Sequence, residues 1–445
     1  MPTATASAST GVFSFLDTDL YKLTMQCAVL KYYSTVDVEY TFTNRTPSMQ
    51  LNEAAFQWLQ EQVAKLADIT LTPRELSFLR KNCPYLPEDY LVYLQNFHLR
   101  PAEQVTLSFH PTDDEFGHVH IKIEGKWVET ILYEIPLLAL TSEAYFKFVD
   151  TDWTRDGQEE QAYDKAVALI KAGCIFSDFG SRRRRDFETQ DRVIRGLVRA
   201  SKDVPGPGRL AGTSNVYMAM EHGLTPIGTV AHEWYMGIAA ISDKYEDANE
   251  LAMKSWLDTF GQGVLGIALT DTFGTPSFFE AFKKPIRRRR PSTADADAFV
   301  DAGPQPAYAE VFTGIRQDSG DPKEYIKLAS DFYEANGFPK GTIVFSDSLN
   351  VENSIEYQAL AKAHGFQPSF GIGTFFTNDF RSLSEPGTKS RPLNIVIKLS
   401  KASGAPAIKL SDDTGKNAGN GAKVEEVKRR LGYTSQAWAS EASRW

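Results

Sequence analysis

Seven short apolar segments, each ending in a polar or glycine-rich tip, constrain the fold of this chain more than any other feature. Helical patterns separate several of them, and the tips recur at intervals of roughly 15 to 45 residues, which β–α units can span. The series predicts a (β/α) barrel over residues 151–394, with its ligand site at the carboxyl ends of the strands. An open doubly wound sheet is the second interpretation. The segments are IFSDFGSR (175–182), LAGTSN (210–215), IGTVAHE (227–233), GIALTDTFG (266–274), GIRQDSGD (314–321), IVFSDS (343–348) and FGIGT (370–374).

The chain before the barrel has a mixed pattern. A helical pattern over residues 18–33 precedes the alternation of Val36, Val38, Tyr40 and Phe42, which is typical of a half-buried strand. We predict an α+β domain over residues 13–150, completed by the C-terminal segment 395–445 with its strand-like LNIVIKLS. Residues 1–12 predict a disordered tail, and the arginine- and alanine-rich stretch 283–306 predicts a surface insertion in the barrel.

The net charge, the length of the apolar runs and the cysteine count argue against several protein classes. A net charge of −9 argues against a nucleic-acid coat or membrane-surface protein, and no apolar run is long enough to span a bilayer. Three cysteines without a CxxC motif fit a reducing compartment. We therefore expect a cytoplasmic protein without nucleic-acid or membrane partners. The arginine run at 287–290 also allows nuclear import, although a solvated loop is the favoured interpretation.

His232 is the most informative single residue, because it ends the apolar segment Ile227–Val230. A zinc ligand, a buried structural histidine and a reactive group are the three interpretations. HEWYM begins like the zinc motif HExxH, but Met236 replaces the second histidine. The position at a strand tip favours a reactive group over a core histidine.

Other tips carry charges that suit an anionic ligand. Four arginines follow Gly180, and arginine near a helix start is disfavoured by the helix dipole unless an anion binds there. Asp318 and Asp347 could hold ribose hydroxyls or a magnesium ion. The glycine-rich turn at Gly371 and Gly373 could present backbone N–H groups to a phosphate.

Taken in order, these motifs resemble the nicotinate phosphoribosyltransferases, especially the fungal type. The resemblance runs from Asp17 to about Gly419. It implies an irregular (β/α) barrel of the type II phosphoribosyltransferase kind, packed on an α+β domain. The motifs that carry it are LDTDLYKLTM, FTNR, FSDFGSRR, GTSN, GTVAHEW, TDTFGT, RQDSGDP, FSDSLN, FGIGT and LNIVIKLS.

The resemblance also implies a reaction in NAD salvage by the Preiss–Handler route. Nicotinate, phosphoribosyl pyrophosphate, ATP and water would give nicotinate mononucleotide, pyrophosphate, ADP and phosphate. The histidine that matches His232 would be phosphorylated by ATP, and the phosphoenzyme would bind both substrates better. Mg²⁺ would be carried on the phosphates, and the protein would be a monomer or homodimer.

Roles for individual residues follow from the resemblance. Nicotinate would lie between Phe179 and Tyr21, which a neighbouring subunit donates in dimeric relatives, with Arg316 beside it. Glu233 would orient or charge-balance the imidazole, and Trp234 would pack in the core. The expected contacts to ribose, phosphate or pyrophosphate are Arg182, Asp318, Asp347, Gly373, Thr374, Lys398 and Lys409.

Ser214 is expected to decide between acid and amide. In related nicotinamide phosphoribosyltransferases this position is aspartate, whereas a hydroxyl can donate to a carboxylate. A lost charge-assisted hydrogen bond costs roughly 1.5–3 kcal/mol, so nicotinate should be preferred by about 10- to 150-fold. The alternatives are a nicotinamide- or quinolinate-type transferase, a ligand-sensing barrel without turnover, and a metal-dependent barrel hydrolase.

Overall fold

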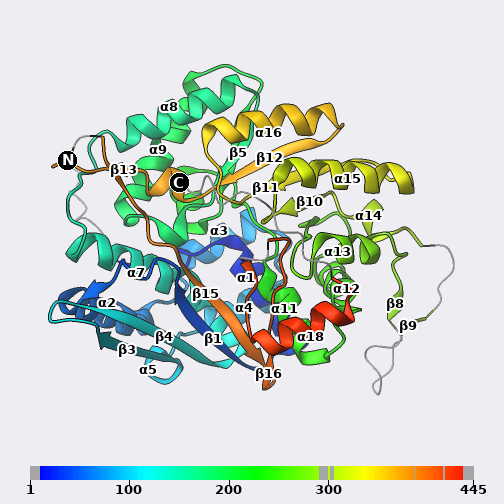
Figure 1. The fold of residues 1–445 in the computed structure, drawn as a ribbon, viewed down its shortest axis with the longest axis horizontal. Helices are drawn as coiled ribbons and strands as arrows, with labels where there is room; N and C mark the ends of the chain where they lie inside the picture. The colour runs from blue at the N-terminus through cyan, green and yellow to red at the C-terminus, as the bar shows by residue number, and fades with distance from the viewer. Residues whose placement is uncertain (1–10, 290–298, 301–304, 386, 414–415, 434–445) are drawn as a thin grey trace.

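A computed structural model describes residues 11–289, 299–300, 305–385, 387–413 and 416–433. Two sheets organise this part of the chain (Figure 1), one parallel and one antiparallel. The helices α8, α9, α15 and α16 cover the parallel sheet, and the antiparallel sheet lies in the opposite half of the molecule. Within the described residues, no helix is long and apolar enough to cross a membrane.

The parallel sheet is a ring with one irregular member. Its six strands are ordered β6-β5-β12-β11-β10-β7, so the last strand of the series pairs with the first. Between β6 and β7 runs the segment 225–230, which makes one parallel bridge, Thr213 with Pro226. The Ile227 N–H donates to Thr213 O, and Thr229 Oγ1 donates to Ile267 O, so the segment spans the gap. The strands are β5 (Ile175–Asp178), β6 (Arg209–Thr213), β7 (Ile267–Leu269), β10 (Gly314–Gln317), β11 (Thr342–Phe345) and β12 (Gln367–Ile372).

This ring confirms the predicted barrel and excludes the open doubly wound sheet. One expected strand is wrong: Ile227–Val230 is extended but forms no ladder. Pro226 has no N–H to donate, and Gly228 has a φ of 154°, which L side chains rarely adopt. The helices of this half are α8 (Gln158–Lys171), α9 (Phe187–Asp203), α10 (Val216–His222), α11 (His232–Ser242), α12 (Ala248–Phe260), α13 (Thr275–Phe282), α14 (Tyr308–Val311), α15 (Pro322–Asn336), α16 (Val351–Ala363), α17 (Thr374–Thr377) and the 3₁₀ turn η3 (Ser181–Arg183).

The antiparallel sheet combines the two ends of the chain. Its order is β16-β15-β1-β4-β2, with β3 also on β4, and β15 pairs with β1 over Val38–Asn44. The strands are β1 (Asp37–Asn44), β2 (Leu51–Asn52), β3 (Val105–Pro111), β4 (Phe116–Lys126), β15 (Ile395–Ala402) and β16 (Ala405–Pro406). The helices around it are α1 (Leu20–Tyr33), α2 (Glu53–Lys65), η1 (Leu66–Asp68), α3 (Pro73–Asn82), α4 (Glu88–Gln95), α5 (Pro101–Gln104), α6 (Trp127–Thr130), η2 (Ile131–Tyr133), α7 (Glu134–Phe148) and α18 (Gly421–Arg430). The division of the chain at residues 150 and 394 stays a prediction.

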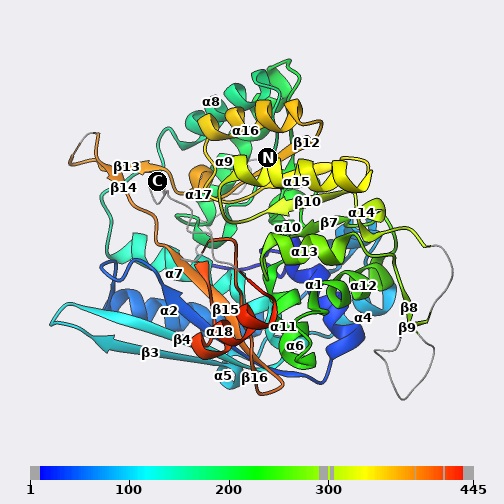
Figure 2. The same ribbon diagram turned by 45° about the vertical axis from the view of Figure 1, so that its right-hand side comes forward.

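Two small hairpins project from the body of the molecule (Figure 2). β8 (Arg288–Arg289) and β9 (Phe299–Val300) lie in the predicted insertion, and β13 (Phe380–Arg381) pairs with β14 (Lys389–Ser390). The insertion is closed at its base by the bridge between Pro285 and Ala307, and Arg287 forms two hydrogen bonds of 2.6 Å with the buried Glu250. The first residues of the insertion are therefore anchored, which its composition did not predict.

The predicted N-terminal tail is too long. Residues 1–10 lie outside the described range, but the Gly11 N–H donates to the Glu143 carboxylate at 3.1 Å, and Gly11 is buried. Packing of the described chain therefore begins at Gly11, within the segment that was predicted to be a disordered tail.

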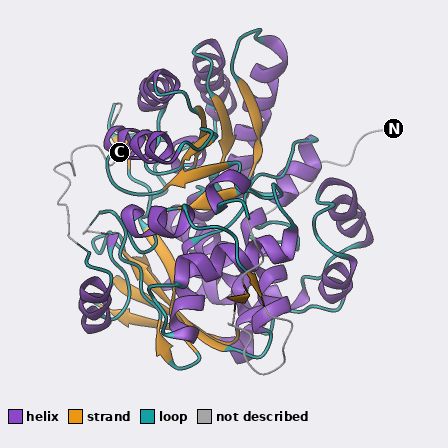
Figure 3. Ribbon diagram, turned by 90° about the vertical axis from the view of Figure 1, so that its right-hand side faces the viewer, coloured by secondary structure: helices purple, strands orange, loops and turns teal. Residues whose placement is uncertain are grey.

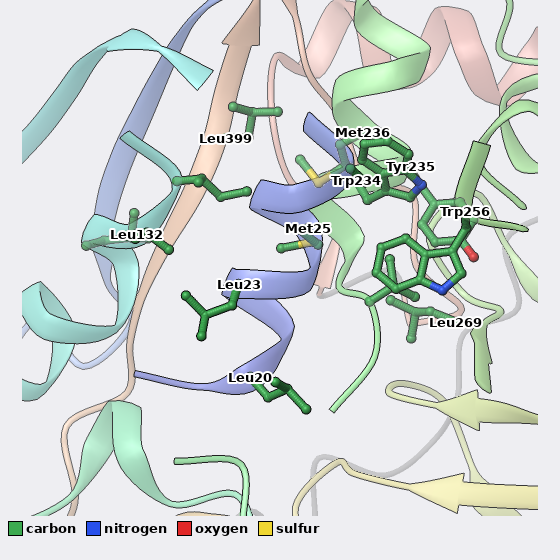
Figure 4. Close-up of a cluster of buried hydrophobic side chains, with 14 of the residues drawn as sticks. Leu20, Leu23, Met25, Leu132, Trp234, Tyr235, Met236, Trp256, Leu269 and Leu399 are labelled. Atoms are coloured by element: carbon green, nitrogen blue, oxygen red, sulfur yellow. The ribbon is translucent and has the colours of Figure 1, made fainter. Parts of the chain in front are cut away.

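The core lies between the two sheets (Figure 3). α1, α11 and α12 meet there, and the side chains of Met25, Trp234, Met236, Trp256 and Leu399 gather in one cluster (Figure 4). Trp234 is fully buried, which confirms its expected packing role. This shared core fixes α1, from the N-terminal segment, against the helix that begins at His232.

Candidate active site

A cavity of about 310 Å³ lies at the carboxyl ends of the parallel strands, facing β15. It brings together nearly all of the predicted site residues within one chain. They are Tyr21, Phe179, Arg182, His232, Arg316, Asp318, Asp347, Gly373, Thr374, Lys398 and Lys409. Of the predicted site residues, only Ser214 does not line the cavity.

Aromatic rings flank one side of this cavity. Tyr21, in the first turn of α1, and Phe179, directly after β5, both face it. Gly371 on β12 makes room for the Phe179 ring, since a Cβ there would lie 2.3 Å from two ring atoms. The Phe179 N–H donates to Ile372 O at 2.8 Å, which fixes the ring between β5 and β12. A flat aromatic ligand fits beside these rings.

The arginine run 182–185 divides between cavity and interior. Arg182 and Arg183 line the cavity, whereas Arg184 and Arg185 are almost fully buried. Arg184 forms a bidentate pair with Asp17, with both distances 2.7 Å. Arg185 lies over the rings of Phe146 and Phe380. Only the first two arginines can therefore contact a ligand.

His232 is the first residue of α11 and is surrounded by charged groups. Its Nδ1 lies 3.0 Å from Thr272 Oγ1, and its Nε2 lies 3.0 Å from Asp318 Oδ2 and 2.9 Å from Lys409 Nζ. Burial and the nearby Lys409 ammonium lower the pKa of His232, outweighing the carboxylates of Asp271 and Asp318. The imidazole is thus neutral at pH 7. Lys409 Nζ can only donate a hydrogen bond to Nε2, and Asp318 Oδ2 can only accept one, so the two groups compete for this nitrogen. When Lys409 donates, the lone pair lies on Nε2.

Asp318 is held ionised at the centre of the site. Its Oδ1 accepts hydrogen bonds from Arg316 Nη2 at 3.0 Å and Ser346 Oγ at 2.7 Å. Burial alone would raise the pKa of Asp318, but Arg316 and His232 keep it well below its usual range. Arg316 also donates to Val230 O, so it is held beside the segment that leads to His232.

The remaining wall of the cavity is strongly cationic. Lys398 projects from β15, and Lys416 pairs with Asp347. Burial, followed by the neighbouring Arg45 and Lys409, lowers the pKa of Lys398 to about 7. Such a cluster of like charges is unfavourable unless an anion binds among them. Seven cationic residues line the cavity: Arg45, Arg182, Arg183, Arg316, Lys398, Lys409 and Lys416.

Gly373 and Thr374 close the cavity beyond β12. Gly373 is the N-cap residue of the four-residue helix α17, with Thr374 as the first helical residue. Both residues line the cavity, and a Cβ at Gly373 would lie 3.0 Å from Phe179 O, so this turn packs directly against the residue that follows β5.

Ser214 lies behind the cavity rather than in its wall. Its Oγ donates to Asp19 Oδ1 at 2.7 Å, and Ser181 Oγ donates to the same oxygen at 2.7 Å. Asp19 is buried, and this burial raises its pKa despite the two hydroxyl donors. The Ser214 hydroxyl is therefore already used as a donor to Asp19, and the direct contact to a ligand carboxylate that we expected is not present in this arrangement.

The expected role of Glu233 is wrong. Its carboxylate points away from the imidazole and accepts hydrogen bonds from Tyr40 at 2.6 Å and Trp127 at 2.8 Å. It also pairs with Lys22. The group that contacts His232 Nε2 in its place is Asp318.

Several site residues were missed at the sequence level. Arg45 stands in the quoted FTNR motif, directly after β1, but was not assigned a role. No local sequence pattern marks Glu134 or Lys416 as a site residue. Each is held at the cavity by an ion pair with a residue distant in the sequence, Lys22 and Asp347 respectively. Charge at the end of a predicted strand could have identified Arg45 alone.

The described residues contain no group of three or more histidine, cysteine or acidic side chains that could hold a metal. The Asp318 carboxylate is already engaged by Arg316, Ser346 and His232, and Asp347 by Lys416. These residues therefore fit Mg²⁺ only as an ion carried on ligand phosphates, with a carboxylate as an additional ligand.

Comparisons with known proteins agree over nearly the whole chain. A family model described as the nicotinate phosphoribosyltransferase (NAPRTase) family matches residues 174–435, and one for the NAPRTase N-terminal domain matches residues 16–142. A probable nicotinate phosphoribosyltransferase from Schizosaccharomyces pombe is 48% identical over 422 residues, covering 94% of this chain and 98% of the relative. The Saccharomyces cerevisiae nicotinate phosphoribosyltransferase is 46% identical over 443 residues, covering 97% and 98%.

Solved structures give the same result. The crystal structure of a putative nicotinate phosphoribosyltransferase from S. cerevisiae superposes with a TM-score of 0.88 at 45% identity, covering 96% of this chain and 100% of that one. The nicotinate phosphoribosyltransferase of Porphyromonas gingivalis superposes with a TM-score of 0.81 at 34% identity, covering 95% and 100%. With two family models, two fungal relatives and the barrel in agreement, this chain belongs to the nicotinate phosphoribosyltransferase family.

Proposed function

We propose that this protein joins nicotinate to phosphoribosyl pyrophosphate, with ATP hydrolysis coupled through a phosphorylated His232. The observation that carries the proposal is the environment of His232 Nε2, which lies 2.9 Å from the Lys409 ammonium within a cationic cavity. Nicotinate and phosphoribosyl pyrophosphate are the substrates that the family membership favours. The cytoplasm and the Preiss–Handler route of NAD salvage are the proposed setting.

The phosphoryl step needs positioning and charge neutralisation more than covalent help. Nε2 attacks the γ-phosphorus of ATP, a nitrogen–phosphorus bond forms, and ADP leaves with the electrons of the broken phosphorus–oxygen bond. A neutral imidazole has the lone pair that this attack requires, and the lowered pKa of His232 keeps it available at pH 7. Lys409 lies where it can stabilise the transferred phosphoryl group.

The glycosyl step uses the aromatic side of the cavity together with Arg316 and Asp318. The ring nitrogen of nicotinate forms a bond to the anomeric carbon while the bond from that carbon to pyrophosphate breaks. Tyr21 and Phe179 orient the ring, and Arg316 lies beside it. Asp318, held as a carboxylate, faces the positive charge that develops on the ribose. Water then hydrolyses the phosphohistidine to release phosphate.

The anionic parts of the substrates match the cationic wall. Arg182, Lys398, Gly373 and Thr374 hold the 5′-phosphate and pyrophosphate oxygens, and Asp347 contacts the ribose or the metal. A Mg²⁺ ion carried on the substrate would make pyrophosphate a better leaving group, with Asp347 or Asp318 as the residues that would contact it. Ser214 makes no direct contact in the cavity, because its hydroxyl donates to Asp19, so the preference for nicotinate over nicotinamide rests on the family membership. Intact His232, Arg182 and Asp318 disfavour a ligand-sensing barrel without turnover.

Phosphohistidine labelling tests the proposal. Incubation with γ-labelled ATP and Mg²⁺ should give a label that acid removes and base preserves, and His232→Ala should remove it. His222→Ala is the matched control, because His222 is also partly buried and paired with a carboxylate, Asp191, at 2.8 Å. An unlabelled wild-type protein, or equal labelling of His232→Ala, would falsify the assignment.

A further inference from the structure

Lys22 is a fully buried cation that bridges two carboxylates from distant parts of the chain. Its Nζ lies 2.5 Å from Glu134 Oε2 and 2.5 Å from Glu233 Oε2, and its side chain has no exposed surface. Burial alone would lower the pKa of Lys22, but the two carboxylates raise it, so the side chain is charged. Buried ion pairs contribute little net stability compared with apolar residues, so stability alone does not explain this bridge.

The two carboxylates connect Lys22 to different parts of the cavity. Glu134 Oε1 lies 3.5 Å from the Tyr21 hydroxyl and 3.6 Å from Arg182 Nη1, on the side assigned to nicotinate. Burial would raise the pKa of Glu134, but Lys22 and Arg182 lower it. Glu233 directly follows His232 at the start of α11 and is fixed further by Tyr40 and Trp127. Lys22 therefore links the ring-binding side to the helix that carries the histidine.

The same turn of α1 also braces the segment before His232. Thr24 Oγ1 donates to Thr229 O at 2.7 Å, and the Ala231 N–H points at Met25 Sδ at 3.5 Å. Gly228 packs closely on this turn, since a Cβ there would lie 3.2 Å from the Tyr21 nitrogen. Figure 4 shows this part of α1 beside Trp234 and Met236 of α11. One helical turn thus contacts both the aromatic side of the cavity and the backbone that leads to His232.

We propose that Lys22 is a positioning residue that couples occupation of the nicotinate side of the cavity to the phosphorylation state of His232. The inference rests on the proposed function. A phosphoryl group on Nε2 displaces the charges around the start of α11, and the Glu233–Lys22–Glu134 bridge passes that change to Tyr21 and Arg182. Because coupling between two sites is reciprocal, nicotinate must stabilise phosphohistidine by the factor by which phosphorylation improves nicotinate binding.

The test compares nicotinate affinity before and after phosphorylation. Calorimetric titration gives the dissociation constant with and without prior incubation with ATP and Mg²⁺, and the label on His232 is measured in parallel. We expect a gain of about fivefold or more in the wild type, as is usual for coupled sites. In Lys22→Met the gain should disappear while His232 still takes the label, and Lys22→Arg should recover part of it.

Lys254→Met is the matched control, because Lys254 is also buried but pairs with Asp258 within α12. It should keep the full gain. A folded Lys22→Met protein with an undiminished gain would overturn the inference. If Lys22→Met does not fold, Glu134→Gln takes its place, since it retains the bond from Lys22 to Glu233, and an undiminished gain there has the same consequence.

The two proposals fail in different ways. If the wild type takes no label on His232, the proposed function fails and the coupling fails with it. If the wild type is labelled and shows the gain, but Lys22→Met shows it equally, only the inference is wrong.

Discussion

At the scale of single residues, Lys398 shows how the site is prepared for an anion. It stands on β15 opposite Thr41, and its ammonium lies in the field of Arg45, Lys409 and Lys416, with Asp318 as the opposing charge. Burial and these cations lower its pKa to about 7, so the side chain is half-protonated at neutral pH. A bound phosphate would restore the pKa toward its ordinary value near 10.4.

Anion binding should therefore take up a proton above pH 7. Between about pH 7 and 9 the free protein has lost the proton and the complex has it, so affinity for phosphoribosyl pyrophosphate should fall by up to about tenfold per pH unit. Below pH 7 both states are protonated, and the dependence should vanish. Calorimetry in buffers of different ionisation enthalpy measures the uptake. Lys398→Arg removes this titration and serves as the control; the same uptake in that variant would contradict the prediction.

The sequence predicted which residues would lie together where a motif followed an apolar segment, although their roles in the site stay predictions. Phe179, His232, Asp318 and Gly373 follow apolar segments directly, and all line the cavity. It could not assign the partners of charged side chains. Arg182 and Arg184 belong to the same run of four arginines, and the sequence does not distinguish them. Arg182 lines the cavity, whereas Arg184 pairs with Asp17, which lies 167 residues away. Glu233 failed for the same reason, because its partners lie on α1, β1 and α6.

At the scale of the elements, the pairing of β5 with β12 positions the aromatic side of the cavity. Phe179 follows β5, and its ring occupies the space above Gly371 on β12, where a Cβ would lie 2.3 Å away. A side chain at 371 must therefore displace the ring that is proposed to bind nicotinate.

Gly371→Ala should weaken nicotinate binding more than it weakens the fold. Overpacking costs typically 1–3 kcal/mol, and a loss of that size at the ring corresponds to about 5- to 150-fold in KM. Steady-state kinetics and thermal unfolding measure the two effects. Gly421→Ala is the control, because a Cβ there meets nothing within 4 Å. An unchanged KM for nicotinate in Gly371→Ala would show that the ring is not part of the base site.

Most elements follow from local patterns. The capping box at Thr72 and Glu75 is present with Pro73 in the first helical turn, and six of seven apolar segments are strands of the ring. The seventh has the composition of a strand but lacks the ladder, since Pro226 and Gly228 interrupt the pairing that its apolar residues suggest. Such a departure depends on neighbours that the sequence does not place.

At the scale of the whole molecule, segments that are distant in one chain meet at the cavity. Tyr21 comes from α1, His232 from α11 and Lys398 from β15 of the same chain. The N-terminal segment is held beside the barrel by the bonds from the Leu20 N–H to Ser214 O and from the Val216 N–H to Thr18 O, both within the chain. Tyr21 therefore reaches the site without a neighbouring subunit.

Two inactive variants, substituted in different segments of the chain, should not restore each other's activity when they are mixed. Tyr21→Ala and His232→Ala each damage the single cavity of their own chain. A mixture should have only the summed residual activity of the two, at any protein concentration, and steady-state assays of the mixture check this. Recovery of activity on mixing would mean that Tyr21 acts across a subunit interface.

The order of the chain explains why this arrangement was partly predictable. β15 pairs with β1 across more than 350 residues, and Val38 lies opposite Ala402. The pattern of LNIVIKLS predicted a strand, and its return to the N-terminal domain was also predicted, but its partner β1 and its register were not. Long-range pairing of this kind has no local signature, because any exposed strand edge could accept it.

The irregular member of the barrel ring has a consequence for motion. Segment 225–230 has backbone hydrogen bonds to β6 at Thr225 and Ile227 only, and side chains such as Thr24 hold the rest, while the six strands beside it pair in continuous register apart from one shift between Phe176 and Ser177. Segments with few backbone hydrogen bonds open at low free-energy cost. In deuterium exchange this part of the wall should therefore open first, so that the chain leading to His232 can yield while the rest of the ring stays rigid.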